Sequence, residues 1–270
     1  MVTLPVHGAV LVYDEVGTGA PLLLVHGTGA DASTWDGVVP ALAAAGHRVI
    51  TDDRRGYRRS THAPVRDYRV HVDDLAALIE DVGGASHVLG WSSGGTTALA
   101  LAIERPELFA SLVVLEAPWH GLRHATPSLL GALGRAKLAQ ARGHREQAAT
   151  TFFRWASGRQ DGGNGFDDVE PQQQQALLAN AANVLAELDP HPHGLMMEHL
   201  ATSRLAGTGV PTTWLLGERS RDWYRRLQSR VVHAAPSIRT VWVPGASHLA
   251  HLDAPEAFVS AVLDAVDAPR

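Results

Sequence analysis

The segment Gly90-Trp91-Ser92-Ser93-Gly94-Gly95 places a serine between two glycines in the pattern Gly-x-Ser-x-Gly. An apolar pair, Val88-Leu89, precedes this segment, and a run with helical character, 96–103, follows it. That context is typical of a serine on a sharp strand-to-helix turn, where glycines leave room for the neighbouring backbone. The helix N-terminus behind such a serine favours developing negative charge. The pattern therefore predicts that Ser92 is a nucleophile.

The elements around this serine alternate between short apolar segments and helical patterns. The spacing predicts strands over 9–13, 22–25, 48–51, 87–91 and 112–115, with helices from Asp31 or Ser33 to Gly46, over 70–82 and over 93–104. The same alternation resumes later with strands over 212–216 and 240–243 and helices over 223–233 and 255–266. Apolar strands separated by helices indicate a parallel sheet that is covered on both faces.

Residues 119–207 interrupt this alternation because they contain helical patterns only, over 127–141, 145–157 and 172–188, with a Gly/Asp-rich loop over 161–168. A helical excursion of roughly 90 residues is far longer than an ordinary connection. Excursions from a rigid scaffold often carry function, so we expect a cap over an active site, with a decorative insertion as the alternative. The predicted organisation is an α/β core of residues 1–118 and 208–270 with a helical cap of residues 119–207.

The composition excludes several classes of protein and site. The chain has 270 residues, 23 Lys and Arg against 28 Asp and Glu, a net charge of −5 and no cysteine. The absence of a basic stripe argues against nucleic-acid and anionic-membrane binding. The absence of cysteine excludes disulfides, thiolate metal sites and cysteine nucleophiles. No basic leader with an apolar core and no apolar run near the roughly 18 residues of a membrane span is present, so we expect a cytoplasmic protein.

Four motifs resemble the α/β-hydrolase family over nearly the whole chain. His26-Gly27-Thr28-Gly29 resembles the oxyanion loop of that family, and the serine turn resembles its nucleophile turn. The segment 53–60, Asp-Arg-Arg-Gly-Tyr-Arg-Arg-Ser, resembles the D-x-R-G-x-G-x-S turn, with Arg58 where glycine is usual. Gly245-Ala246-Ser247-His248 resembles the G-x-G-H segment of the catalytic histidine, with Ser247 replacing glycine. The resemblance implies an α/β-hydrolase fold, a mostly parallel central sheet flanked by helices with an inserted helical cap.

The resemblance also implies roles for particular residues. It makes His248, which follows the predicted strand 240–243, the base that activates Ser92, with His251 as the rival. An oxyanion hole needs two converging backbone N–H groups. One belongs to Ser93, directly after the nucleophile, and the resemblance assigns the other to Thr28.

The acid of the expected triad departs from the common pattern. Many α/β-hydrolases carry it in a G-x-x-D segment after the strand here predicted at 212–216, but this chain reads Gly217-Glu218-Arg219-Ser220. A serine holds no negative charge with which to orient the histidine. Three carboxylates could replace it: Glu116, directly after strand 112–115, Asp222, and Glu218, whose tight turn points it less favourably. We prefer Glu116, because the tip of the strand beside the nucleophile's strand reaches the catalytic edge; an ion pair between cap and core is the alternative role.

An acid after this strand is a known variant in the family, found in some dehalogenases and in fungal-type zearalenone lactonases. The segments 90–94 and 115–118, Gly-Trp-Ser-Ser-Gly and Leu-Glu-Ala-Pro, resemble the lactonase pattern. Carboxylate-nucleophile chemistry of the epoxide hydrolase or haloalkane dehalogenase type is disfavoured, because Ser92 occupies the position of the nucleophile.

Three histidines, His191, His193 and His199, form a loose cluster in the sequence. Their spacing matches no familiar ligand pattern, and Pro190 and Pro192 mark the first two as loop residues. We therefore expect solvated loop histidines, no metal site and no cofactor.

The expected activity is hydrolysis of a carboxylic ester or lactone of a medium-sized, mostly apolar small molecule through an acyl-enzyme. Four aromatic residues are candidates for substrate contact: Trp91, Trp119, Phe153 and Trp155. Carbon–carbon bond hydrolysis, perhydrolysis and a slow-turnover ligand receptor of the same fold are the alternatives. The expected partners are this small molecule and, as an option, a second copy of the chain in a homodimer.

Overall fold

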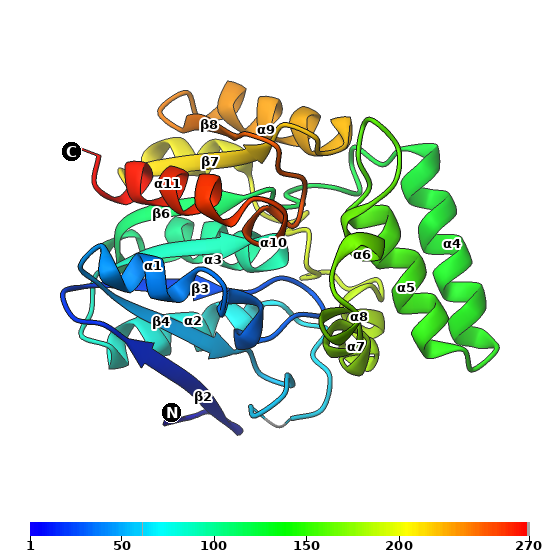
Figure 1. Cartoon of the computed structure of the whole chain (residues 1–270), viewed down its shortest axis with the longest axis horizontal. Helices are drawn as coiled ribbons and strands as arrows, with labels where there is room; N and C mark the ends of the chain where they lie inside the picture. The colour runs from blue at the N-terminus through cyan, green and yellow to red at the C-terminus, as the bar shows by residue number, and fades with distance from the viewer. Residues whose placement is uncertain (61, 269–270) are drawn as a thin grey trace.

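An eight-stranded sheet forms the centre of the computed structural model, which describes residues 1–60 and 62–268 (Figure 1). The strands are β1 (Val2–Val6), β2 (Ala9–Val16), β3 (Ala20–Val25), β4 (His47–Asp53), β5 (Ser86–Trp91), β6 (Phe109–Leu115), β7 (Thr212–Gly217) and β8 (Arg239–Val243). Their order across the sheet is β1-β2-β4-β3-β5-β6-β7-β8. β1 and β2 pair antiparallel with each other, β2 pairs antiparallel with β4, and all later pairs are parallel. The predicted mostly parallel α/β sheet is confirmed.

The register of the central strands brings two candidate residues together. Trp91, the last residue of β5, pairs with Leu115, the last residue of β6. Ser92 and Glu116 therefore leave the sheet at adjacent positions of its carboxyl edge. β6 in turn pairs Leu115 with Leu215 of β7, which brings the loop after β7 beside them.

Helices cover both faces of the sheet, as the apolar strands predict. α1 (Val39–Ala44) and α11 (Pro255–Val266) pack on one face, against side chains such as Leu24 and Val113. α2 (Arg69–Asp81), α3 (Ser93–Glu104) and α9 (Asp222–Ala234) pack on the other face. The two apolar cores on either side of the sheet fix the strand ends that carry the site.

Segment 119–207 contains α4 (Pro127–Ala141), α5 (Arg145–Ala156), α6 (Gly165–Asp168), α7 (Pro171–Ala179), α8 (Ala181–Glu187) and a 3₁₀ turn, Thr202–Gly207. The five α-helices gather beyond the carboxyl ends of the parallel strands (Figure 1). The predicted helices over 127–141 and 145–157 are confirmed within a residue. No helix in the described ranges is both long enough and apolar enough to cross a bilayer.

Several predicted elements were wrong in detail. Strand β1 was not predicted, because it buries little and Pro5 within it argues against a strand except at a sheet edge. The predicted helix up to Gly46 is a 3₁₀ turn, Ala32–Trp35, followed by α1. The predicted helix 172–188 is divided into α7 and α8 at Asn180, whose side chain donates to the core carbonyl of Gly29. The predicted loop 161–168 ends in the short helix α6.

Candidate active site

Ser92 stands on the turn between β5 and α3 with φ +54° and ψ −120°, a backbone conformation that L-residues seldom adopt. The turn brings backbone very close to the flanking glycines. A Cβ on Gly94 would lie 2.4 Å from the carbonyl oxygen of Val25, and one on Gly90 would lie 2.6 Å from the carbonyl oxygen of Gly94. Glycine is therefore required on both sides, and the turn presents the Ser92 hydroxyl at the edge of the sheet.

His248 lies in the loop after β8, and its Nε2 is 3.2 Å from Ser92 Oγ. The side chain is buried. The indole N–H of Trp91, the residue before the nucleophile, donates to the carbonyl oxygen of His248 over 2.8 Å. The loop of the histidine is thus tied directly to the turn of the serine.

Glu116 follows β6 with φ +47° and is fully buried. Its Oε2 is 2.9 Å from His248 Nδ1, and its Oε1 accepts the backbone N–H of Gly217 over 2.9 Å. A carboxylate accepts only, so Nδ1 carries the proton and the neutral ring has its lone pair on Nε2. The arrangement can accept a proton from Ser92 and then stabilise the imidazolium.

The other carboxylates considered for this role lie elsewhere. Asp222 is exposed at the start of α9, and Glu218 Oε2 accepts the backbone N–H of Gly245 over 3.1 Å. Within residues 1–60 and 62–268, neither one contacts His248. The alternative assignment of Asp222 is therefore corrected by geometry. Ser220, at the common position of the acid, is buried and its Oγ has no described hydrogen-bond partner.

His251, the rival base, faces away from Ser92. Its Nε2 lies 2.8 Å from Thr34 Oγ1, and its ring packs edge-on against Trp91 with centroids 4.5 Å apart. Burial and the nearby His248 lower the pKa of His251 to about 3. The ring is therefore neutral and structural across the physiological pH range.

The two candidate oxyanion donors lie on either side of Ser92. Ser93 is the first residue of α3, where backbone N–H groups have no intrahelical acceptor. Thr28 lines the same cavity as Ser92 and His248. It occupies a tight turn closed by the Ala30 N–H and the Gly27 carbonyl at 3.2 Å. Both residues lie near Ser92, as the sequence analysis expects. Their role in binding an oxyanion remains a prediction.

The cavity beside Ser92 has a volume of about 30 Å³ and an apolar lining. Trp91 and Phe153, two of the predicted substrate contacts, line it. The lining also contains Phe152, Phe166, Leu177 and Leu249. Phe166 belongs to the short helix α6, which was predicted as loop, so no signal placed it here.

Trp119 and Trp155 do not line this cavity, and substrate contact by these two residues stays a prediction. The indole N–H of Trp119 contacts Thr202 Oγ1 at 2.9 Å. That of Trp155 contacts Ser128 Oγ at 3.3 Å, and the ring packs edge-on against Trp223. Both indoles are buried inside segment 119–207 and its contact with α9, where large aromatic side chains contribute packing.

Tyr224, which the sequence analysis missed, lies against the histidine. Its ring is parallel to that of His248, with centroids 4.4 Å apart and planes at 10°, and its Oη is 3.2 Å from His248 Nε2. The hydroxyl also donates to the carbonyl oxygen of Ala156 over 3.2 Å. Burial, reinforced by the charge of Glu116, raises the pKa of Tyr224 well above its usual value, so the phenol stays neutral. The helical pattern over 223–233 predicts helix α9, but no feature of the sequence predicts the contact between Tyr224 and His248.

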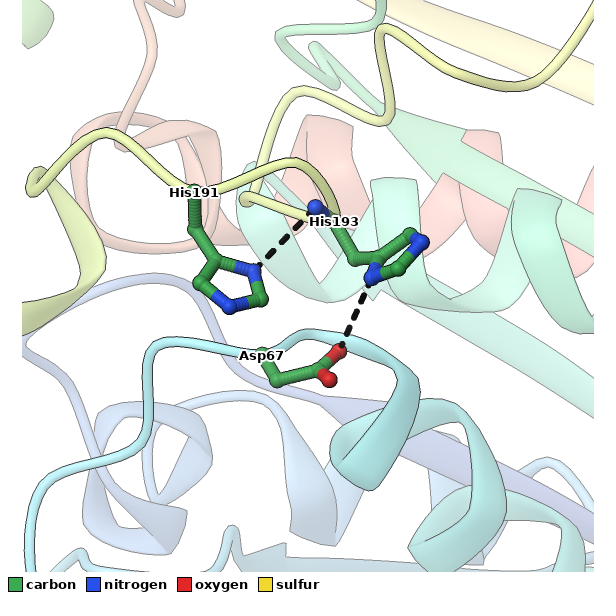
Figure 2. Close-up of side chains that lie close together, drawn as sticks. All are labelled: Asp67, His191 and His193. Carbon is green, nitrogen blue, oxygen red and sulfur yellow. Dashed lines mark hydrogen bonds and ion pairs between the residues drawn. The ribbon is translucent and has the colours of Figure 1, made fainter.

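Two histidines of segment 119–207, His191 and His193, lie close to Asp67 (Figure 2). The side chains of Asp67, His191 and His193 offer ligand atoms within 4.8 Å of one another. However, the Arg69 guanidinium hydrogen-bonds to Asp67 and lowers its pKa to about 2, and His191 Nδ1 accepts the backbone N–H of His193 over 3.1 Å. His193 Nδ1 is 3.8 Å from Asp67 Oδ1. Asp67 and His191 thus have partners within the protein, and the expectation of no metal at these histidines stays a prediction.

The chain is similar to known proteins over most of its length. Residues 22–261 match the family described as "Alpha/beta hydrolase family". A pimeloyl-[acyl-carrier protein] methyl ester esterase from Aeromonas hydrophila is 29% identical over 260 residues, which cover 92% of this chain and 96% of that protein. An sn-1-specific diacylglycerol lipase from Mus musculus is 26% identical over 89% of this chain and 79% of that protein. The crystal structure of an alpha/beta hydrolase from Sphaerobacter thermophilus is 27% identical and superposes with a TM-score of 0.73, covering 97% of this chain and 99% of that one.

Proposed function

The chain belongs to the alpha/beta hydrolase family, and on that premise we propose that it is a serine hydrolase of carboxylic esters or lactones. The observation that carries the proposal is the continuous line of contacts from Ser92 Oγ through His248 to Glu116, at 3.2 Å and 2.9 Å. Relatives whose names describe an esterase and a lipase support hydrolysis of esters.

In the proposed mechanism, Ser92 Oγ attacks the substrate carbonyl while His248 Nε2 accepts its proton. Glu116 holds the ring in the required tautomer and stabilises the imidazolium. The N–H groups of Thr28 and Ser93 bind the oxyanion that forms. His248 then donates its proton to the leaving alcohol, and a water activated by the same nitrogen hydrolyses the acyl-enzyme.

The substrate that we propose is a medium-sized, mostly apolar ester or lactone. Support comes from the cavity lining beside Ser92, in which Phe152, Phe153 and Phe166 are apolar and aromatic. We further propose that segment 119–207, which contributes these three side chains, is a cap over the site. The placement of the acid after β6 favours lactones as a class to be tested.

The test is a panel of p-nitrophenyl esters, lactones and vinylogous diketones with the wild type and the Ser92→Ala variant. We expect ester or lactone turnover that falls by about 10⁴-fold or more in the variant. A fluorophosphonate probe should label the wild type at Ser92 and leave the variant unlabelled. Undiminished turnover by Ser92→Ala, cleavage of diketones only, or tight ligand binding without turnover would overturn the proposal.

A further inference from the structure

The turn that carries the Thr28 N–H is held through its neighbour Gly29. Gly29 has φ +82°, near the value of the third residue of a type II turn. Its N–H donates to Tyr57 Oη over 3.3 Å, and its carbonyl accepts Asn180 Nδ2 over 3.0 Å. A Cβ here would lie 2.3 Å from the Phe153 ring. Two of these three contacts, Asn180 and Phe153, come from segment 119–207.

The third contact, Tyr57, depends on the same segment. Tyr57 Oη donates to Glu187 Oε1 over 2.8 Å, at the end of α8. Because a carboxylate only accepts, the single phenol proton points to Glu187 and an oxygen lone pair faces the Gly29 N–H. Glu187 is buried and also pairs with Arg54, with Nη2 and Oε1 3.1 Å apart. The charge of Glu187 adds to burial in raising the pKa of Tyr57 well above its usual value, so the phenol keeps this proton.

The cavity beside Ser92 is small, and helices of segment 119–207 form part of its wall. Its volume of about 30 Å³ holds about two water molecules. Phe152, Phe153 and Leu177, from α5 and α7, form part of its wall. A substrate larger than this cavity contacts α5 and α7 beside Ser92, and Asn180 lies at the junction of α7 and α8.

We propose that Asn180 and Glu187 are positioning residues that complete the oxyanion hole only while the cap is seated over Ser92. The inference rests on the proposed function and adds a coupling to it: displacement of α7 and α8 removes the supports of both the Gly29 carbonyl and the Gly29 N–H. Thr28 then loses the fixed turn that aims its N–H. Hydrolysis therefore begins only after the cap has closed over bound substrate, as expected for closure that assembles a catalytic site.

The experiment compares Asn180→Ala with Asn183→Ala on an ester that the wild type cleaves. Asn183 is a matched control, because it is also buried, lies on α8 and donates to a core carbonyl, that of Gly56, over 2.8 Å. We expect Asn180→Ala to lower kcat by about 10- to 100-fold, less than deletion of an oxyanion donor, with KM within about threefold. Asn183→Ala should keep kcat within about threefold.

A second readout separates positioning from general docking of the cap. A trifluoromethyl ketone forms a tetrahedral adduct with the serine, so its affinity should fall in Asn180→Ala in parallel with kcat/KM. An uncleavable ether analogue of the substrate should bind with unchanged affinity. Asn180→Asp, which retains the shape but places an acceptor against the Gly29 carbonyl, provides the same test if the alanine variant folds poorly.

The outcomes distinguish this inference from the proposed function. Full turnover by Ser92→Ala contradicts the proposed function itself. If Ser92 is required but Asn180→Ala and Asn180→Asp keep wild-type kcat, the positioning role is wrong. Equal losses in the Asn180 and Asn183 variants also overturn it, because general docking of the cap then accounts for the effect.

Discussion

Ser92 and Glu116 leave neighbouring strands with positive φ angles, +54° and +47°, which non-glycine residues seldom adopt. They follow the paired residues Trp91 and Leu115, and the Ser92 N–H donates to the Leu115 carbonyl over 2.8 Å. Two residues with positive φ side by side bring both side chains to the same histidine. Strain of this kind is maintained when the surrounding structure over-determines it, here through the fixed register of β5 and β6.

The acid assignment predicts different outcomes for Glu116→Gln and Asp222→Asn. A glutamine at 116 cannot stabilise the imidazolium of His248, so kcat should fall by about 10²- to 10⁴-fold. Asp222 is exposed, and Asp222→Asn should keep kcat within about twofold. Steady-state kinetics on one ester decide the matter: a large loss in Asp222→Asn with little loss in Glu116→Gln would reverse the assignment.

The contact of Tyr224 with His248 predicts a smaller loss of activity in Tyr224→Phe than in Tyr224→Leu. Tyr224→Phe retains the ring that stacks on His248 and loses the contacts of the hydroxyl with Ala156 and with His248 Nε2, so kcat should fall by less than about fivefold. Tyr224→Leu removes an aromatic face from the protonated histidine, an interaction of about 0.5–2 kcal/mol, and should lower kcat by about tenfold. Equal kcat values for the two variants, measured on folded protein, would show that the aromatic face contributes nothing.

The tight nucleophile turn predicts an effect on stability at Gly94. The Cβ of Gly94→Ala would meet the carbonyl oxygens of Val25 and His26 at 2.4 Å and 2.6 Å, and the backbone there has no room to yield. The free energy of unfolding should fall by about 2 kcal/mol or more. Gly134→Ala is the control, since that glycine is exposed in α4 with nothing within 4 Å of its Cβ, and it should gain up to about 1 kcal/mol. Urea denaturation measures both, and a Gly94→Ala variant as stable as the wild type contradicts the argument.

The buried, neutral His251 should make the free energy of unfolding depend on pH. Its pKa is about 3 in the folded chain, against about 6.5 when unfolded, so below pH 6.5 only the unfolded chain takes up the proton. This histidine therefore lowers the free energy of unfolding as the pH falls from about 6.5 toward 3, by up to about 1.4 kcal/mol per pH unit. A glutamine at position 251 can still hydrogen-bond to Thr34 but does not titrate. In His251→Gln, the free energy of unfolding should therefore fall less steeply between pH 6 and pH 4, by up to about 1.4 kcal/mol per pH unit. His7→Gln, an exposed control, should keep the wild-type slope; a His251→Gln slope equal to the wild-type slope refutes the prediction.

The sequence predicted what local patterns encode. Apolar runs located the parallel strands, and the strand tip after 112–115 identified Glu116 as the carboxylate that meets His248. Tyr224 and Asn180 escaped prediction, because their contacts depend on how α9 and α8 pack rather than on any local spacing. Trp119 and Trp155 were selected by residue type, yet a large aromatic side chain is equally suited to packing between helices.

The position of the acid after β6 has a consequence for the loop after β7, where Ser220 occupies the position that the acid commonly has in this family. That loop instead contacts segment 119–207: Gln160 Nε2 donates to the Ser220 carbonyl over 2.8 Å, and its N–H donates to the Arg219 carbonyl over 3.0 Å. The acid and this docking contact thus belong to different strand ends. For protein engineering, residues 219–221 are a place where substitutions can vary the docking of segment 119–207, with Glu218 retained because it accepts the Gly245 N–H in the loop of His248.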